Sequence, residues 1–256
     1  LFLDNHKILA ALGVISFFGV LEKDNQEVKQ ILENSFGLNW NELWENILLL
    51  DKSELVDVYD AKSVKISDQV LAAYAFLKCF IDKTTAVLNY SDWIVCFINE
   101  HEKKVKRTII DIANTFGFKE VKEMVADSLI NAQKKLEADN KNLYKFFDAF
   151  WFYRQYDTLA FVNNWIKGLP EQKIPFEDIK FSYEVNDHIW PPKYLSLMLY
   201  FLDQHTDFTR QAIKMLLELI FKQPSRTPET LKHLCEHLNY HRFDYRHNYV
   251  RQFALF

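Results

Sequence analysis

Glycine, cysteine and early proline are scarce in this sequence. Its 256 residues include five glycines, three cysteines and six prolines, and every proline lies after residue 169. Glycine and proline are the strongest breakers of regular structure, so their scarcity favours long helical stretches in the first two thirds of the chain. The cysteines are odd in number and lack motif spacing, which argues against a disulfide framework and favours a reducing, cytoplasmic compartment.

The sequence also lacks an excess of charge of one sign. Its formal net charge is −4, with acidic and basic residues mixed, so no global field attracts nucleic acid or an anionic membrane. The longest apolar stretch, 8–21, contains Ser16 and two glycines and is too short to span a bilayer. Because the chain begins with Leu1 rather than Met, we expect a segment of a longer polypeptide or a processed product.

Apolar residues, by contrast, are abundant and follow helical spacing. Hydrophobic residues make up 49% and aromatic residues 16% of the chain, which is enough to bury a substantial core. Asp24 with Glu27, and Asn39 with Glu42, have the spacing of capping boxes, and Gly37 is a helix stop signal. Together with the apolar spacing, these signals predict three helices, at about 4–20, 24–37 and 39–50.

The pattern then changes from helical to strand-like. Residues 54–60 and 63–67 alternate between polar and apolar side chains, with a turn at 60–62 between them. We predict one small β-hairpin here, followed by a helix that Ser67 caps and that runs to about Ile81. Three helices followed by a hairpin are the order of a winged helix, a variant of helix-turn-helix architecture. The sequence therefore predicts a winged-helix domain at 1–85.

From residue 86 onward, the pattern predicts one helix after another. The segment from Pro170 to Pro192 carries four prolines and is predicted to be extended. Short helices joined by short turns are typical of an α-solenoid or TPR-like array, so we predict a mainly α fold with an irregular helical-repeat domain at 86–256. The expected helices span 91–100, 102–116, 119–137, 141–153, 156–168, 193–204, 207–222, 228–240 and 242–254.

The run from Glu54 to Tyr74 resembles the winged-helix segment of bacterial STAND NTPases, which are large signal-transduction ATPases related to apoptotic and NLR-type switch proteins. The residues that carry the resemblance are ELVD at 54–57 and VKISDQVLAAY at 64–74, and LGVISFFG at 12–19 is similar too. The resemblance covers residues 1–85 and implies that 86–256 occupies the place of the helical sensor. It also implies an ATP- or ADP-binding parent of the kind used in bacterial stress or anti-phage defence.

At the place where this family often has Met-His-Asp, the present sequence has Ile66-Ser67-Asp68. The family's His approaches the nucleotide phosphates in the closed, ADP-bound state, so the resemblance implies a nucleotide-sensing role for Ser67 and Asp68. A hydroxyl can donate a hydrogen bond to a phosphate, but it carries no positive charge. The alternative is local: Ser67 caps its helix, and Asp68 favours the helix N-terminus through its charge.

No catalytic fingerprint accompanies the resemblance. The phosphate-binding motif G-x-x-x-x-G-K-[ST] does not occur in the chain. His233, His237 and His241 recur every four residues, but H-E-x-x-H and further ligands are missing, so we expect no metal site. The segment is therefore predicted to be non-enzymatic and to bind no cofactor of its own, with any ATPase centre upstream.

The third helix and the hairpin would read the groove if the winged helix bound DNA. Between Asn39 and Ile66 there are six acidic and three basic residues, a net charge of −3. Because DNA affinity comes mainly from phosphate neutralisation, this charge makes DNA an unlikely partner and favours packing against an NTPase domain of the same protein. A winged-helix transcriptional regulator and a plain helical-repeat scaffold are the open alternatives.

Three other groups of residues have both a structural and a binding interpretation. The aromatic block 146–156 is typical of a core helix, although Trp and Tyr are also enriched at binding hot spots. The basic cluster at 103–107 is interpreted as a solvated helix face. In the tail, arginines alternate with aromatic residues spaced by four, which is typical of a packed helix or of a peptide-binding surface. The candidates for contact with a protein ligand are Trp151, Tyr153, Arg242, Tyr245, Arg246 and Tyr249.

Overall fold

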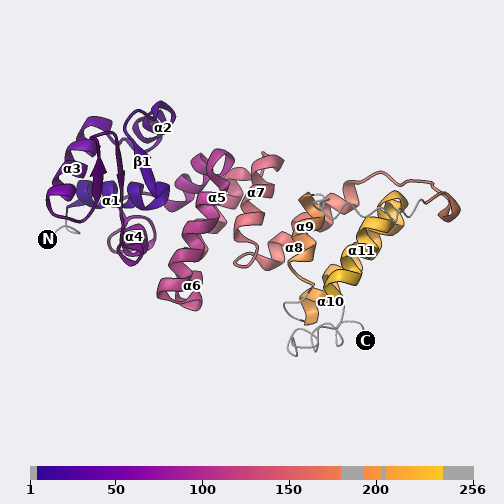
Figure 1. The fold of residues 1–256 in the computed structure, drawn as a ribbon. Helices are drawn as coiled ribbons and strands as arrows, with labels where there is room; N and C mark the ends of the chain where they lie inside the picture. The colour runs from indigo at the N-terminus through magenta and orange to yellow at the C-terminus, as the bar shows by residue number, and fades with distance from the viewer. Residues whose placement is uncertain (1–4, 180–192, 203–205, 239–256) are drawn as a thin grey trace. The chain divides into compact units, whose positions relative to one another are not determined.

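The computed structural model describes residues 5–179, 193–202 and 206–238, which form eleven α-helices and a three-stranded antiparallel sheet (Figure 1). This confirms the predicted mainly α fold with a small β element. The chain divides into two compact units, residues 1–153 and 154–256, and each is described by itself. The predicted domain boundary at residue 85 lies inside the first unit, because the helix that follows it packs on the winged helix.

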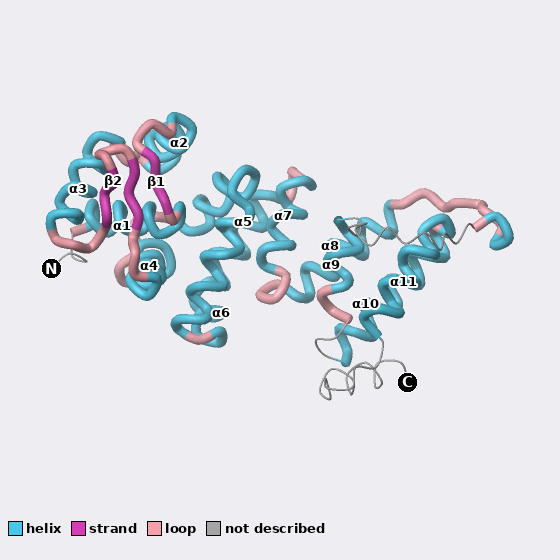
Figure 2. Tube along the Cα trace, in the orientation of Figure 1, coloured by secondary structure: helices cyan, strands magenta, loops and turns pink. Residues whose placement is uncertain are grey.

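The first unit begins with the elements of a winged helix in their expected order. Figure 2 shows the three strands side by side, with α3 on the side of β2. The strand order is β1-β3-β2, and both pairings are antiparallel. The elements are α1 (His6–Phe18), β1 (Val20–Glu22), α2 (Gln26–Phe36), α3 (Trp40–Lys52), β2 (Asp57–Tyr59), β3 (Ser63–Lys65), α4 (Gln69–Phe76) and the π-helical turn η1 (Leu77–Ile81).

The sheet has one strand more than the predicted hairpin. We expected the first helix to continue to about residue 20, but α1 ends at Phe18 and Gly19 turns the chain with a φ of +72°. The next three residues then pair with β3, and Leu21 lies opposite Val64. Both of these side chains are buried. The apolar contact across the sheet therefore decides the strand conformation, over the apolar helical pattern that continues from α1.

Two of the observed helix N-caps lie one residue after the predicted ones. Asn39 caps α3 as expected, since its Oδ1 accepts from the Glu42 N–H at 3.0 Å. Asn25, rather than Asp24, caps α2. Asp68, rather than Ser67, is the N-cap of α4, where a carboxylate satisfies backbone N–H groups that have no partner within the helix.

The predicted hairpin is confirmed, and its turn has a specific backbone geometry. Asp60 and Ala61 have φ values of 49° and 53°, and the Lys62 N–H donates to the Tyr59 carbonyl at 2.9 Å. Positive φ at both central residues is the requirement of a type I′ turn, which matches the twist of paired strands. Glycine or asparagine suits such positions best, so Ala61 is held there at some conformational cost.

Helix α1 forms the centre of the winged helix because almost all of its sides are buried. It packs against α3, α4, η1 and β1. Gly13 lets it approach η1 closely, since a Cβ added there would lie 2.3 Å from the Cys79 Sγ and 2.5 Å from the Cys79 Cβ. The Cys79 thiol is buried, and burial raises its pKa well above the usual range, so it acts as an inert packing group.

The long helix α5 (Tyr90–Phe116) joins the winged helix to the rest of the first unit. Trp93 in its first half is fully buried and lies within 4.6 Å of Phe80 and 5.2 Å of Phe17, measured between ring centroids. Helix α5 also packs against α6 (Phe118–Leu136) and α7 (Asn140–Phe150), and Asp92 near its start pairs with Lys135 of α6. The helix is kinked at His101, where φ is −123° and ψ is 30°. This is the position where the sequence pattern separates two predicted helices.

The second unit contains α8 (Gln155–Gly168), η2 (Phe176–Asp178), α9 (Lys193–Leu199), α10 (Thr206–Lys222), η3 (Pro224–Arg226) and α11 (Thr227–Leu238). Trp165 of α8 stacks on Tyr194 of α9 with ring centroids 4.4 Å apart. The Gln172 side chain donates to the Gln223 side chain at 3.0 Å and thereby holds the chain after α8 on the end of α10. The helix predicted at 242–254 lies outside the described residues. None of the described helices is long and apolar enough to cross a bilayer.

Candidate functional site

The winged helix presents an exposed surface made by α3 and β2, which we call the α3–wing surface. It consists of Glu45, Leu48 and Leu49 on α3 and of Asp57 and Tyr59 on β2. The exposed fractions of Leu48, Leu49 and Tyr59 are 44%, 50% and 47%. Large apolar side chains therefore stand in the part of the fold with which a DNA-binding winged helix contacts the groove.

The α3–wing surface is held together by hydrogen bonds between its elements. The Asp51 Oδ1 accepts from the Val58 N–H at 3.0 Å, which fixes the end of α3 to β2. Leu48 lies one turn before Asp51 and so projects from the same side of the helix. On the sheet, the Lys65 ammonium lies 5.3 Å from the centroid of the Tyr59 ring, and a hydrogen bond with Tyr59 raises the pKa of Lys65. The surface thus combines exposed apolar side chains with charged ones.

Ser67 and Asp68, the predicted nucleotide-sensing residues, lie where the chain passes from β3 to α4. The Ser67 hydroxyl donates to the Asp57 carboxylate. The Asp68 carboxylate accepts from the Val70 and Leu71 N–H groups at 2.8 and 2.9 Å. The hydroxyl proton is therefore in use, and two carboxylates flank it. A phosphate bound here would meet the negative charges of Asp57 and Asp68. Its role toward a nucleotide stays a prediction.

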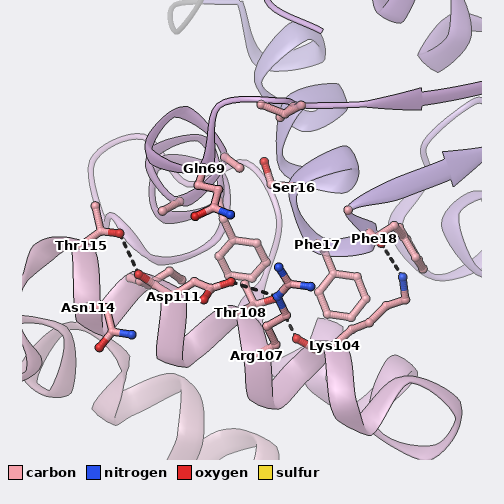
Figure 3. Close-up of a pocket in the computed structure, with 16 residues that line it drawn as sticks. Ser16, Phe17, Phe18, Gln69, Lys104, Arg107, Thr108, Asp111, Asn114 and Thr115 are labelled. Carbon is pink, nitrogen blue, oxygen red and sulfur yellow. Dashed lines mark hydrogen bonds and ion pairs between the residues drawn. The ribbon is translucent and has the colours of Figure 1, made fainter. Parts of the chain in front are cut away.

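A cavity of about 320 Å³ lies between the end of α1, α4 and the second half of α5 (Figure 3). Its apolar lining includes Phe17, Phe76 and Ala73, together with Ile112 from α5. Gln69 from α4 and Arg107 from α5 approach the cavity from opposite walls. Pockets that hold small ligands combine an apolar floor with a few polar groups, and their volumes begin at roughly 300 Å³. The remaining lining residues are Ser16, Phe18, Gly19, Ile66, Ala72, Lys104, Thr108, Asp111, Asn114 and Thr115.

Two cations from one face of α5 line this cavity. The Lys104 ammonium donates to the Phe18 carbonyl at the end of α1, and it lies 5.6 Å from the Phe18 ring centroid. Burial, with a smaller contribution from Arg107, lowers the pKa of Lys104. The Arg107 Nε lies 3.4 Å from the Asp111 Oδ2. Two positive charges and one negative charge give the lining a net positive charge.

The basic cluster at 103–107 was interpreted from the sequence as a solvated face, and the structure corrects this for Lys104. Its ammonium is partly buried and bound to the end of α1. A cation at a helix C-terminus interacts favourably with the helix dipole. The sequence gives no signal for this contact, because Phe18 and Lys104 are 86 positions apart. Lys106 points elsewhere and forms an ion pair with Asp148 at 3.0 Å.

The aromatic candidates for protein contact have packing roles in the first unit. Tyr153 lies against Phe118, with ring centroids 5.1 Å apart, and burial raises the pKa of Tyr153 to about 12. Trp151 contacts Phe152 at 5.2 Å. Both are half-buried, so a packing role is present, and a partner role stays a prediction. The tail candidates Arg242, Tyr245, Arg246 and Tyr249 lie outside the described residues.

Within the described part of the chain, no group of three His, Cys, Asp or Glu side chains is placed to hold a metal ion. His233 lies against Glu236, with 3.3 Å between Nδ1 and Oε2. His241, the third member of the histidine series, lies outside the described residues.

Comparison with known proteins gives no match: no protein family, curated protein or solved structure is significantly similar to this chain.

Proposed function

We propose that residues 1–85 are the regulatory winged helix of a STAND-type signalling NTPase in the cytoplasm, and that the helices after residue 85 recognise a protein ligand. The observation that carries the proposal is the exposed face of α3, where Leu48 and Leu49 stand beside Glu45. A DNA-reading helix places Lys and Arg there to contact phosphates and guanines. Apolar residues with a charged rim are the arrangement of a protein-docking surface.

In the proposed resting state, the α3–wing surface packs on the nucleotide domain and buries Leu48 and Leu49. Ligand binding to the later helices favours the open state and so releases this contact. Helix α5 couples the two events, because its Trp93 packs on Phe17 of the winged helix while α6 and α7 pack against the same helix. A ligand that inverts a 1:99 equilibrium must prefer the open state by about 5.5 kcal/mol.

The first test is the coding sequence upstream of Leu1. The proposal requires a G-x-x-x-x-G-K-[ST] motif within a few hundred residues before this position, and the absence of the motif there removes the proposal.

The second test measures the ADP that co-purifies with the full-length protein. The double variant Leu48→Glu with Leu49→Glu places two carboxylates in the proposed contact, and we expect it to retain at most about a fifth of the wild-type ADP, a loss of about 1 kcal/mol in coupling. Leu217→Glu is the matched control, since Leu217 has a similar exposed fraction of 42% on α10. Equal retention by the double variant and this control contradicts the proposal.

The same assay separates the two interpretations of the residues that precede α4. Ser67→Ala removes the hydroxyl, while Asp68→Ser keeps a helix cap but removes the carboxylate. Reduced ADP retention in either variant supports nucleotide sensing. Wild-type retention in both leaves Ser67 and Asp68 with the hydrogen bonds of the β3–α4 junction only.

A DNA-binding regulator is the alternative that the order of elements favours. It requires the α3–wing surface to attract phosphates, although the stretch from Asn39 to Ile66 has three more acidic than basic residues. The alternative predicts salt-dependent binding to duplex DNA, which the docking proposal does not.

A further inference from the structure

We propose that the cavity between α1, α4 and α5 binds a small organic anion that has a flat apolar body. This proposal does not rest on the family resemblance or on the docking of the α3–wing surface, because the cavity and its lining carry it alone.

The apolar body would lie on the floor of the cavity. Phe17 and Phe76 line the cavity, are nearly fully buried and have ring centroids 6.4 Å apart, and the small side chains of Ala72 and Ala73 line the cavity too. Small side chains beside aromatic rings form a slot for a planar group, since rings prefer offset or edge contacts with other rings. A volume of about 320 Å³ limits the ligand to a few rings or a short chain.

The anionic group would meet the two cations of α5. Lys104 and Arg107 are one turn apart and therefore project from the same face of the helix. Among the described residues, no carboxylate pairs with Lys104, and Arg107 shares its charge with Asp111 alone. A guanidinium has five N–H donors, so Arg107 can bind an incoming carboxylate or sulfonate while it keeps Asp111. The Arg107 side chain is 77% exposed, so the guanidinium lies at the solvent-exposed edge of the cavity, beside Asp111 (Figure 3).

The hydroxyl groups of the lining can only accept hydrogen bonds from a ligand, because each already donates its proton within its own helix. Ser16 donates to the Leu12 carbonyl at 2.7 Å, Thr108 to the Lys104 carbonyl at 2.8 Å, and Thr115 to the Asp111 carbonyl at 2.8 Å. Their protons are thus bound to their own helices, and only oxygen lone pairs face a ligand. Among the side chains of the lining, an anion can therefore gain hydrogen bonds only from the two cations and from the Gln69 and Asn114 amides. Its charged end would lie nearest α5, which supplies both cations and Asn114, whereas Gln69 belongs to α4.

Binding in this cavity would also fix α4 against α5. The lining comes from both helices, so a ligand bridges the winged helix and the helix that follows it. Any ligand that binds only this arrangement stabilises it by mass action.

The test uses the intact 256-residue chain and two fluorescent probes with the same aromatic ring system. One is 8-anilinonaphthalene-1-sulfonate, which is anionic, and the other is N-phenyl-1-naphthylamine, which lacks the sulfonate. We expect saturable binding of the anionic probe below about 1 mM and at least fivefold tighter binding than of the neutral probe, as a charge-assisted hydrogen bond provides.

Three variants assign this binding to the cavity. Arg107→Gln is expected to weaken binding of the anionic probe about tenfold and to change the affinity for the neutral probe less than twofold. Lys103→Gln is the matched control, because Lys103 is an exposed cation of the same helix that does not line the cavity. Ala72→Trp fills the slot and is expected to weaken both probes more than tenfold, with far-UV circular dichroism as the check of folding.

Two results would overturn the proposal. One is the absence of saturable binding of the anionic probe to the wild-type chain. The other is an equal effect of Arg107→Gln and Lys103→Gln, which means that the probe responds to overall charge rather than to this site. Should Ala72→Trp fail to fold, Lys104→Met replaces it, since it removes the second cation of the lining, and its expected effect is again confined to the anionic probe.

Discussion

Two helices of the winged helix, α1 and α3, differ in how much of their apolar surface is buried. Helix α1 has 13 residues, and ten of them are buried, including Gly13 at its closest approach to η1. Helix α3 also has 13 residues but keeps Leu48 and Leu49 exposed, next to a hairpin whose turn holds Ala61 at positive φ. Stability is thus concentrated around α1, whereas α3 and the wing carry exposed apolar surface that the fold does not need. Substitutions should separate these two roles.

The largest loss of stability is expected for Gly13→Ala. The added Cβ would lie 2.5 Å from the Cys79 Cβ, closer than real Cβ contacts come, so α1 and η1 must move apart. Overpacking of this kind costs about 3 kcal/mol. Urea denaturation followed by far-UV circular dichroism gives the change in the free energy of unfolding. Gly168→Ala is the control, because nothing lies within 4 Å of its added Cβ. A loss below about 0.5 kcal/mol for Gly13→Ala would show that the seam between α1 and η1 is loosely packed.

A smaller loss is expected for Asp68→Ala, at the start of α4. The substitution removes the acceptor of the Val70 and Leu71 N–H groups, and loss of an N-cap costs about 1 kcal/mol. Asp68→Ser keeps a capping oxygen and should recover most of this stability in the same denaturation experiment. If Asp68→Ser is as unstable as Asp68→Ala, the charge at the helix N-terminus matters more than the cap.

The turn of the wing is expected to gain stability from Ala61→Gly. Glycine has no steric penalty at a φ of 53°, which stabilises the folded state. The greater entropy of the unfolded chain opposes this effect, and we expect a net gain of about 0.5–1 kcal/mol. Ala72→Gly is the matched control with the opposite sign, since glycine inside a helix costs about 1 kcal/mol. The midpoint of thermal unfolding should rise for the first variant and fall for the second. A fall for both would mean that the backbone at Ala61 is not held at positive φ in solution.

The smallest effect on stability is expected at Leu48 and Leu49, the residues of the proposed docking contact. The double variant Leu48→Glu with Leu49→Glu changes exposed positions, so its free energy of unfolding should stay within about 0.5 kcal/mol of the wild-type value. Wild-type stability combined with loss of ADP from the full-length protein would separate docking from folding. A loss of several kcal/mol, measured by the same urea denaturation, would instead place these leucines in the core.

Local patterns predicted most helices of this fold. The spacing of apolar residues and the stop signal at Gly37 define helix ends that lie within a few residues of the observed ones. The kink at His101 also falls where the pattern separates two helices. These features depend on neighbours in the sequence, which is why they can be read from it.

Features that depend on distant residues could not be predicted in the same way. Strand β1 has only three residues, and its pairing of Leu21 with Val64 joins positions 43 apart. The cavity draws its lining from α1, α4 and α5, and from Ile66 in the connection between β3 and α4. For the same reason the basic residues of α5 could be recognised as a cluster, but the burial of Lys104 at the end of α1 could not.

The central claim is that the α3–wing surface contacts protein rather than DNA. The most direct test measures the fluorescence anisotropy of a labelled duplex of about 30 base pairs. The duplex is titrated with the intact chain at 50 and 200 mM salt. We expect no saturable binding below about 10 μM at either salt concentration, because the stretch from Asn39 to Ile66 has three more acidic than basic residues and repels the phosphates. Binding tighter than about 1 μM at 50 mM salt, weakened at 200 mM salt and abolished by Leu48→Glu with Leu49→Glu, would contradict the claim and establish the surface as a DNA reader.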